Sequence, residues 1–148
     1  MMLKLSSMLV LVATILGPTA AIVPGPHIIH SVAAKTQVIA VPPGPPTAPV
    51  GVNQGNVPLP FMQWDIQPFQ RGYLFLNKQS GKFLSLVGTK VVLDAKPIAW
   101  NIVEEPGKFE IVAMAGTVVG LTGPQNGAPL DLNPDRKQPP QQWVFQHL

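Results

Sequence analysis

Histidine is the residue type most often used both as a general base and as a transition-metal ligand, and cysteine is absent from this chain. The chain has three histidines, His27, His30 and His147. His27 and His30 are three residues apart on an expected strand, where side chains alternate between faces, so they point in opposite directions. His147 lies near the C-terminal end of the sequence. We therefore expect surface histidines, no catalytic residue and no metal site, because a structural or catalytic zinc needs three or four ligands within bonding reach.

Paired carboxylates are a second arrangement that could do chemistry, because glycoside hydrolysis uses two of them. Glu104 and Glu105 are neighbours, and neighbouring side chains of an extended chain point to opposite sides. A hydrolase would need a distant partner such as Asp94 or Asp131. No glycine-containing segment has the arrangement of a phosphate-binding loop between a strand and a helix. The sequence thus predicts a protein that is not an enzyme and that has no cofactor.

The charge pattern argues against a nucleic acid partner. The chain has 10 Lys and Arg against 7 Asp and Glu, which gives a formal net charge of +3. Like charges are adjacent only at Arg136-Lys137 and Glu104-Glu105. A protein that follows a phosphate backbone clusters its basic residues on one face or along one helix.

Residues 1–21 differ in composition from the rest of the chain. Lys4 provides a short positive region, residues 8–16 form an apolar run, and Thr19-Ala20-Ala21 provides small residues of the kind found at cleavage sites. The apolar run is shorter than the roughly 20 residues of a membrane span. We interpret residues 1–21 as a signal peptide and expect residues 22–148 to form one secreted, extracellular domain without a membrane span.

The elements that position the remaining side chains are marked by three tryptophans, Trp64, Trp100 and Trp143, which are 36 and 43 residues apart. Each is followed two residues later by a large apolar residue. Residues i and i+2 share one face of a strand, so each pair is expected to enter a common interior. We interpret the tryptophans as core residues and as markers of a threefold internal repeat.

Short apolar segments separated by Gly, Pro and Asn predict four strands in each repeat, and no segment keeps a helical apolar stripe for more than two turns. This pattern is typical of all-β sandwiches and barrels, and the threefold repetition favours a closed barrel. The expected strands are 27–32, 36–41, 49–52 and 63–66, then 73–77, 82–87, 90–93 and 99–103, then 108–112, 117–121, 128–132 and 142–145.

Seven prolines between residues 42 and 60 leave two interpretations open. The composition alone suits a polyproline linker. However, if residues 22–60 were only a tail, the other two repeats would form an incomplete barrel with open, apolar strand edges, which folded proteins avoid. We therefore interpret the segment as a rigid loop within the first repeat.

The last repeat contains the sequence Gln141-Gln142-Trp143. A four-strand unit that ends in Gln-x-Trp and occurs three times resembles the ricin B-type β-trefoil lectins, and the resemblance spans most of residues 22–148. It implies an all-β, β-trefoil fold with pseudo-threefold symmetry and repeats at about 22–68, 69–105 and 106–148. We call each tryptophan with its neighbouring residues a tryptophan frame. In the first two frames Met62 and Ile98 stand two positions before the tryptophan, where the motif has glutamine, so one repeat matches fully.

The family resemblance implies binding of glycans or glycoproteins. In such sites an acidic residue accepts hydrogen bonds from sugar hydroxyls, and a nearby aromatic ring packs on the apolar face of the sugar. In this sequence the acidic position holds Ser85 in the second repeat and Gly120 in the third, and the aromatic position holds Asp94 and Asn133. The usual galactose site is therefore altered.

A polar set in the last repeat could still bind sugar, and the alternative is a group of solvated turns. The candidates for this carbohydrate site are Asn126, Asp131, Asn133 and Gln141.

The chain is also similar to the fungal β-trefoil protease inhibitors, whose tryptophan frames need not carry Gln-x-Trp and whose activity lies on a projecting loop. Three rigid turns are candidates for such a loop here, at residues 42–60, 123–127 and 133–140. A third possibility is a secreted scaffold or effector-like protein that uses the fold without either activity, because fold does not determine function.

Overall fold

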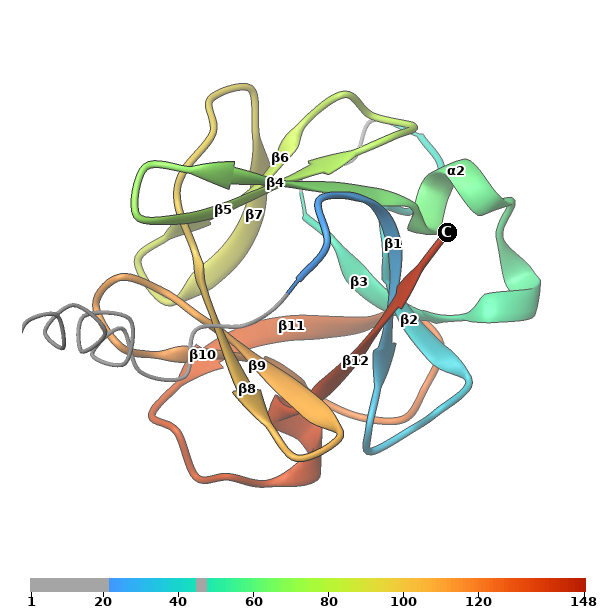
Figure 1. Ribbon diagram of the computed structural model, residues 1–148. Helices are drawn as coiled ribbons and strands as arrows, with labels where there is room; N and C mark the ends of the chain where they lie inside the picture. Colours follow the sequence, from blue (N-terminus) through green and yellow to red (C-terminus); the bar gives the residue numbers. More distant parts are fainter. Residues whose placement is uncertain (1–21, 45–47) are drawn as a thin grey trace, which may run out of the picture.

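In the computed structural model, the structure describes residues 22–44 and 48–148, so the expected signal peptide lies outside the described residues. The described residues form twelve strands, and each overlaps one of the expected ranges (Figure 1). The strands are β1 (Gly25–Ser31), β2 (Gln37–Ala40), β3 (Val50–Asn53), β4 (Trp64–Phe69), β5 (Gly72–Asn77), β6 (Phe83–Val87), β7 (Lys90–Asp94), β8 (Asn101–Glu105), β9 (Lys108–Val112), β10 (Val118–Leu121), β11 (Ala128–Asn133) and β12 (Trp143–His147). The all-β prediction is confirmed.

Antiparallel pairings join these strands into a closed arrangement. The first and last strands lie side by side, with Ile29 opposite Phe145 (Figure 1). β1 also pairs with β4, β4 with β5, β8 with β9, and β9 with β12. An isolated bridge between Tyr73 and Trp100 links β5 to the residue before β8 and completes the ring. Among the described residues, β8 pairs along its length with β9, and this single bridge is the link on its other side.

The three tryptophans are fully buried in one hydrophobic cluster, which confirms that they are core residues. A buried indole N–H usually has a hydrogen-bond acceptor, because an unpaired buried donor is costly. Trp64 Nε1 donates to the carbonyl of Ile39 at 2.8 Å, Trp100 Nε1 to that of Leu84 at 2.9 Å, and Trp143 Nε1 to that of Val119 at 3.1 Å. The three acceptors lie on β2, β6 and β10, which are the second strands of the three expected repeats.

The proline-rich segment is part of the domain. Within it lie β3, a short 3₁₀ turn η1 (Gln54–Asn56) and one helical turn, α2 (Leu59–Met62). Met62 packs with Val38 and Val52 in a second, smaller hydrophobic cluster, and the Val41 N–H donates to the Phe61 carbonyl at 2.9 Å. These contacts tie β3 and α2 to the rest of the described residues, and the assignment of the segment to a first repeat stays a prediction. The short helical turns had no signal in the apolar pattern, because one turn is too short to show a period.

Across residues 22–44 and 48–148, none of the helices has both the length and the apolar character that a membrane crossing requires.

Replacing one tryptophan tests the role of the indole hydrogen bonds. In Trp100→Phe the buried Leu84 carbonyl loses its donor and a small cavity remains, so we expect the free energy of unfolding to fall by about 2–4 kcal/mol. Urea unfolding followed by circular dichroism measures this change. Val87→Thr, at a side chain that is 65% exposed, is the control and should change stability by less than about 0.5 kcal/mol. Equal effects of the two substitutions would contradict the assignment.

Candidate functional site

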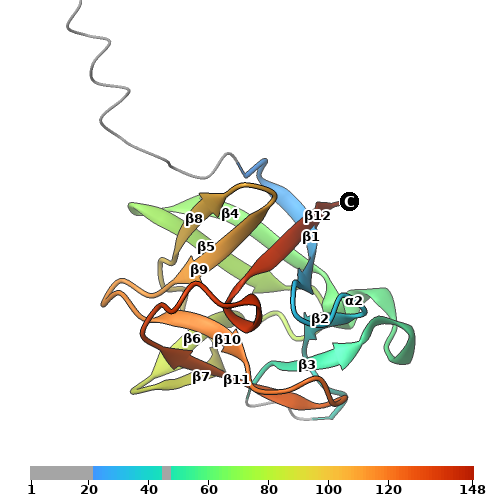
Figure 2. The same ribbon diagram turned by 90° about the horizontal axis from the view of Figure 1, so that it is seen from below.

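A shallow polar depression of about 250 Å³ lies over the hairpin of β10 and β11, beside the chain segment that leads into β12. That segment contains a 3₁₀ turn, η2 (Pro139–Gln141), which lies next to β10 (Figure 2). We call this depression the β10–β11 pocket. Its lining residues are Gly120, Leu121, Thr122, Asp131, Asn133, Arg136, Gln138, Pro140 and Gln141.

Three of the four residues expected to bind sugar line this one pocket. Asp131 and Asn133 lie on β11, with half-buried side chains, and Gln141 comes from η2. Asn126 does not line the pocket: its side-chain Oδ1 accepts a hydrogen bond from the Asn53 N–H at 2.7 Å and ties the β10–β11 turn to β3. The structure thus separates Asn126 from the other candidates.

The β10–β11 register brings Asp131 to the position where the family resemblance implied an acid. Gly120 is paired with Asp131 across the two strands. A Cβ added to Gly120 would lie 3.0 Å from the Asp131 Oδ1. The carboxylate therefore reaches from β11 into the space that a side chain at position 120 would fill. The position where an acid was expected holds Gly120, which has no side chain, and Asp131 on the neighbouring strand β11 provides a carboxylate there.

Gln141 positions the loop that forms one wall of the pocket. Its Nε2 donates to the Pro134 carbonyl at 2.9 Å, and its Oε1 accepts from the Arg136 N–H at 2.8 Å. The residue is buried, and it lies two positions before the buried Trp143. The glutamine of the Gln-x-Trp sequence thus connects the core to the loop. Its role as a sugar ligand stays a prediction.

The other side of the same loop is held by ion pairs. Lys137 Nζ contacts the carboxylates of Glu105 at 3.0 Å, Asp135 at 3.0 Å and Glu110 at 3.2 Å. These carboxylates, Asp135 first, hold the pKa of Lys137 above its ordinary value. Lys137 has a φ of 54°, a left-handed conformation that is uncommon outside glycine. Charge pairing on one face and Gln141 on the other therefore restrain the loop.

Glu110 is the most buried member of this cluster, with 1% of its side chain exposed. Its Oε2 has no hydrogen-bond partner among the described residues. Burial, followed by the interaction with Asp135, raises the pKa of Glu110 to about 7, and the hydrogen bond with Lys137 opposes the shift. One ammonium cannot neutralise three carboxylates, so the most desolvated of them retains its proton to the highest pH.

Comparison with known proteins gives structural matches but no sequence matches. No protein-family model and no curated protein matches this chain. The Macrolepiota procera ricin B-like lectin, solved in complex with lactose, has a TM-score of 0.78 and 20% identity over 87% of this chain and 100% of its own. The Rhizoctonia solani agglutinin has a TM-score of 0.75 and 20% identity over 87% and 99%. This chain resembles the ricin B-like β-trefoil lectins. The resemblance at these identities is one of fold.

A proteinase inhibitor from Coprinopsis cinerea is also similar in structure to this β-trefoil-like chain. Its TM-score is 0.72, at 12% identity over 86% of this chain and 100% of its own. The fold is therefore shared by a lectin and a proteinase inhibitor.

The histidines of this β-trefoil-like domain are arranged differently from the expectation. His27 is 2% exposed, so the prediction of a surface histidine is wrong for this residue. It lies opposite His147 in the β1–β12 pair, with ring centroids 4.8 Å apart. Burial lowers the pKa of His27, and its Nδ1 donates to the Gly25 carbonyl at 2.9 Å. Among residues 22–44 and 48–148, no group of three or more His, Cys, Asp or Glu side chains could hold a metal ion.

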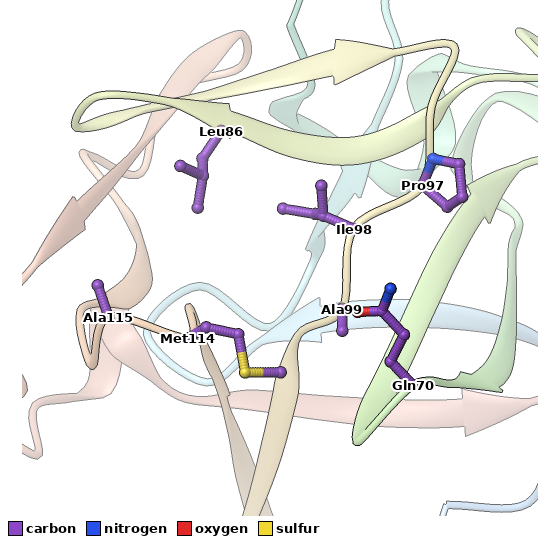
Figure 3. A pocket seen from close by; sticks show the side chains of 7 residues that line it. All are labelled: Gln70, Leu86, Pro97, Ile98, Ala99, Met114 and Ala115. Atoms are coloured by element: carbon purple, nitrogen blue, oxygen red, sulfur yellow. The ribbon is translucent and has the colours of Figure 1, made fainter.

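A larger depression, of about 480 Å³, lies beside the second tryptophan frame and has a different character. Figure 3 shows Leu86, Ile98 and Met114 directed into one space from three separate segments. Ile98 holds the position that Gln141 has in the third frame, so this depression lacks the amide that organises a polar loop. Gln70 provides its one polar side chain. Aliphatic walls of this kind do not offer acceptors to sugar hydroxyls.

Substitution of Glu110 tests the ionisation of the Lys137 cluster. Glu110 has a folded-state pKa of about 7 against an ordinary value of 4.5, so the stability it contributes is complete below pH 4.5 and is lost as the pH rises through 7. We expect the difference in unfolding free energy between the wild type and Glu110→Gln to shrink by on the order of 2 kcal/mol from pH 5 to pH 8.

Urea unfolding of both proteins at each pH measures this difference, and the contribution of His27 cancels because it is present in both. A difference that stays constant from pH 5 to pH 8 would contradict the raised pKa.

Proposed function

We propose that this chain is a secreted, non-catalytic carbohydrate-binding module of the ricin B-like type, with its sugar site in the β10–β11 pocket. The observation that carries the proposal is the convergence of Asp131, Asn133 and the restrained 134–140 loop on one shallow depression beside Gly120. The structural likeness to lectins solved with sugars supports the proposal at the level of the fold.

The chemistry of the pocket suits a sugar ring. A carboxylate such as that of Asp131 accepts hydrogen bonds from two adjacent hydroxyls, and the Asn133 amide can both donate and accept. Leu121 and Pro140 add apolar surface on which C–H groups of a sugar can pack, in place of the missing aromatic ring. The volume of about 250 Å³ is below the roughly 300–1,000 Å³ of pockets for drug-sized ligands. We therefore expect weak binding of one terminal sugar residue.

The proposal includes the architecture and location of the chain. We propose three four-strand repeats at about 22–68, 69–105 and 106–148, a division supported by the equivalent indole hydrogen bonds of the three tryptophans. We also propose that residues 1–21 are removed on export and that the protein acts outside the cell, on the composition of that segment.

A second candidate function is inhibition of a protease by the 134–140 loop. Every residue of this loop is exposed, and the hydrogen bonds of Gln141 and the ion pairs of Lys137 restrain it. A restrained, exposed loop loses little conformational entropy on docking to an active-site cleft. The likeness to the Coprinopsis cinerea inhibitor supports this candidate through the fold.

Titration of a panel of serine and cysteine proteases with the protein separates the two candidates. If the loop is an inhibitory loop, residual protease activity falls stoichiometrically at micromolar protein. Unchanged activity of every protease at that concentration would rule against the inhibitor candidate and leave the sugar-binding proposal in place.

A glycan array followed by calorimetry with the best glycan tests the carbohydrate site. We expect saturable binding that weakens by about tenfold or more in Asp131→Ala, because a charge-assisted hydrogen bond is lost. Asn126→Ala is the matched control, since Asn126 lies on the same hairpin but outside the pocket, and it should bind like the wild type. A blank array, or equal binding by Asp131→Ala and the wild type, would refute the proposed site.

A further inference from the structure

We infer that the β10–β11 pocket selects acidic glycans, with the Arg136 guanidinium binding a carboxylate or sulfate group on the sugar. This inference rests on the proposed carbohydrate function and specifies the ligand class of the same site. Arg136 was not among the residues that the sequence singled out as a ligand, although it lines the pocket together with Asp131 and Asn133.

The guanidinium of Arg136 has no partner within the described part of the chain. Its backbone N–H and C=O are both engaged, by Gln141 Oε1 at 2.8 Å and Gln138 Nε2 at 3.2 Å. Its side chain makes no hydrogen bond and no ion pair with residues 22–44 and 48–148. The main chain of Arg136 is thus held in place while its five N–H donors remain available.

Three carboxylates near the loop, other than that of Asp131 in the pocket, are engaged by the neighbouring lysine. Glu105, Glu110 and Asp135 all pair with Lys137, whose positive φ turns this side chain toward β8 and β9. A backbone outlier of this kind is kept only where the surrounding contacts over-determine it. The two adjacent basic residues therefore have different surroundings. Lys137 pairs with the acidic cluster, and Arg136 lines the pocket.

The pocket therefore presents two kinds of recognition group. Asp131 and Asn133 offer acceptors to hydroxyls, and Arg136 offers a planar donor fork that matches a carboxylate or a sulfate. A neutral sugar would use the first set alone and leave the guanidinium in water. A ligand that carries hydroxyls and one anionic group would use both. The net positive charge of the chain also favours approach of an anionic glycan.

Calorimetry with three related probes tests the inference: lactose, 3′-sialyllactose and 3′-sulfolactose, each at low and at high salt. We expect at least one of the anionic probes to bind about tenfold or more tightly than lactose at low salt, with a smaller preference at high salt. A preference for sialyllactose alone identifies a carboxylate, and one for sulfolactose alone identifies a sulfate. A preference for both identifies a general anion site.

Variants of Arg136 assign the preference to its side chain. Arg136→Gln should reduce anionic binding to about the level of lactose, and Arg136→Lys should retain part of the preference because it keeps the charge without the planar fork. Arg71→Gln, at an exposed arginine in the β4–β5 turn, is the matched control and should bind all probes like the wild type. Because the Arg136 side chain has no partner among the described residues, we expect the variant to fold normally.

The outcomes separate this inference from the proposed function. If the wild type binds lactose as tightly as the anionic probes, or if Arg136→Gln keeps the anionic preference, the inference is wrong and the carbohydrate proposal stands. If no glycan binds the wild type, both are wrong.

Discussion

The need to satisfy three buried indole N–H groups governs the arrangement of this chain. Each tryptophan lies in the interior, where an unpaired N–H would cost about 1–3 kcal/mol, and each donates to a carbonyl on a strand 16 to 25 residues earlier. These hydrogen bonds hold a late strand of each repeat against an early one. The turns that connect these strands are therefore fixed in position relative to the core. The candidate site depends on the position of Trp143, because the 134–140 loop leads directly into Gln141-Gln142-Trp143.

The site follows from the core in two steps. Gln141 is buried two residues before Trp143, and its amide nitrogen and oxygen bind the backbone of the 134–140 loop at Pro134 and Arg136. On the opposite face, Lys137 bridges to carboxylates of β8 and β9, so the loop is restrained from two sides. The second frame has Ile98 instead of glutamine, and an apolar depression lies there. The third frame therefore has a buried amide that holds its loop, and the second frame has an aliphatic side chain at the same position.

The sequence predicted local features well and contacts between distant strands poorly. Every expected strand is present, and the buried tryptophans were recognised, because two-residue periodicity and turn residues are local signals. Asp131 was named as one of a polar set in the last repeat once the family resemblance had been stated, and its role as a sugar ligand stays a prediction. The His27–His147 contact was missed because it requires the register of the first strand against the last. Arg136 and Lys137 are adjacent in sequence, and the sequence pattern does not indicate that Arg136 lines the pocket while Lys137 pairs with carboxylates of β8 and β9.

The most direct test of this account is a crystal structure of the protein with 3′-sialyllactose. The account predicts density for the glycan in the β10–β11 pocket, with sugar hydroxyls within hydrogen-bond distance of the Asp131 carboxylate and the acidic group on the Arg136 guanidinium. Ordered glycan in the apolar depression beside Ile98, or at any surface that excludes Asp131, would contradict it.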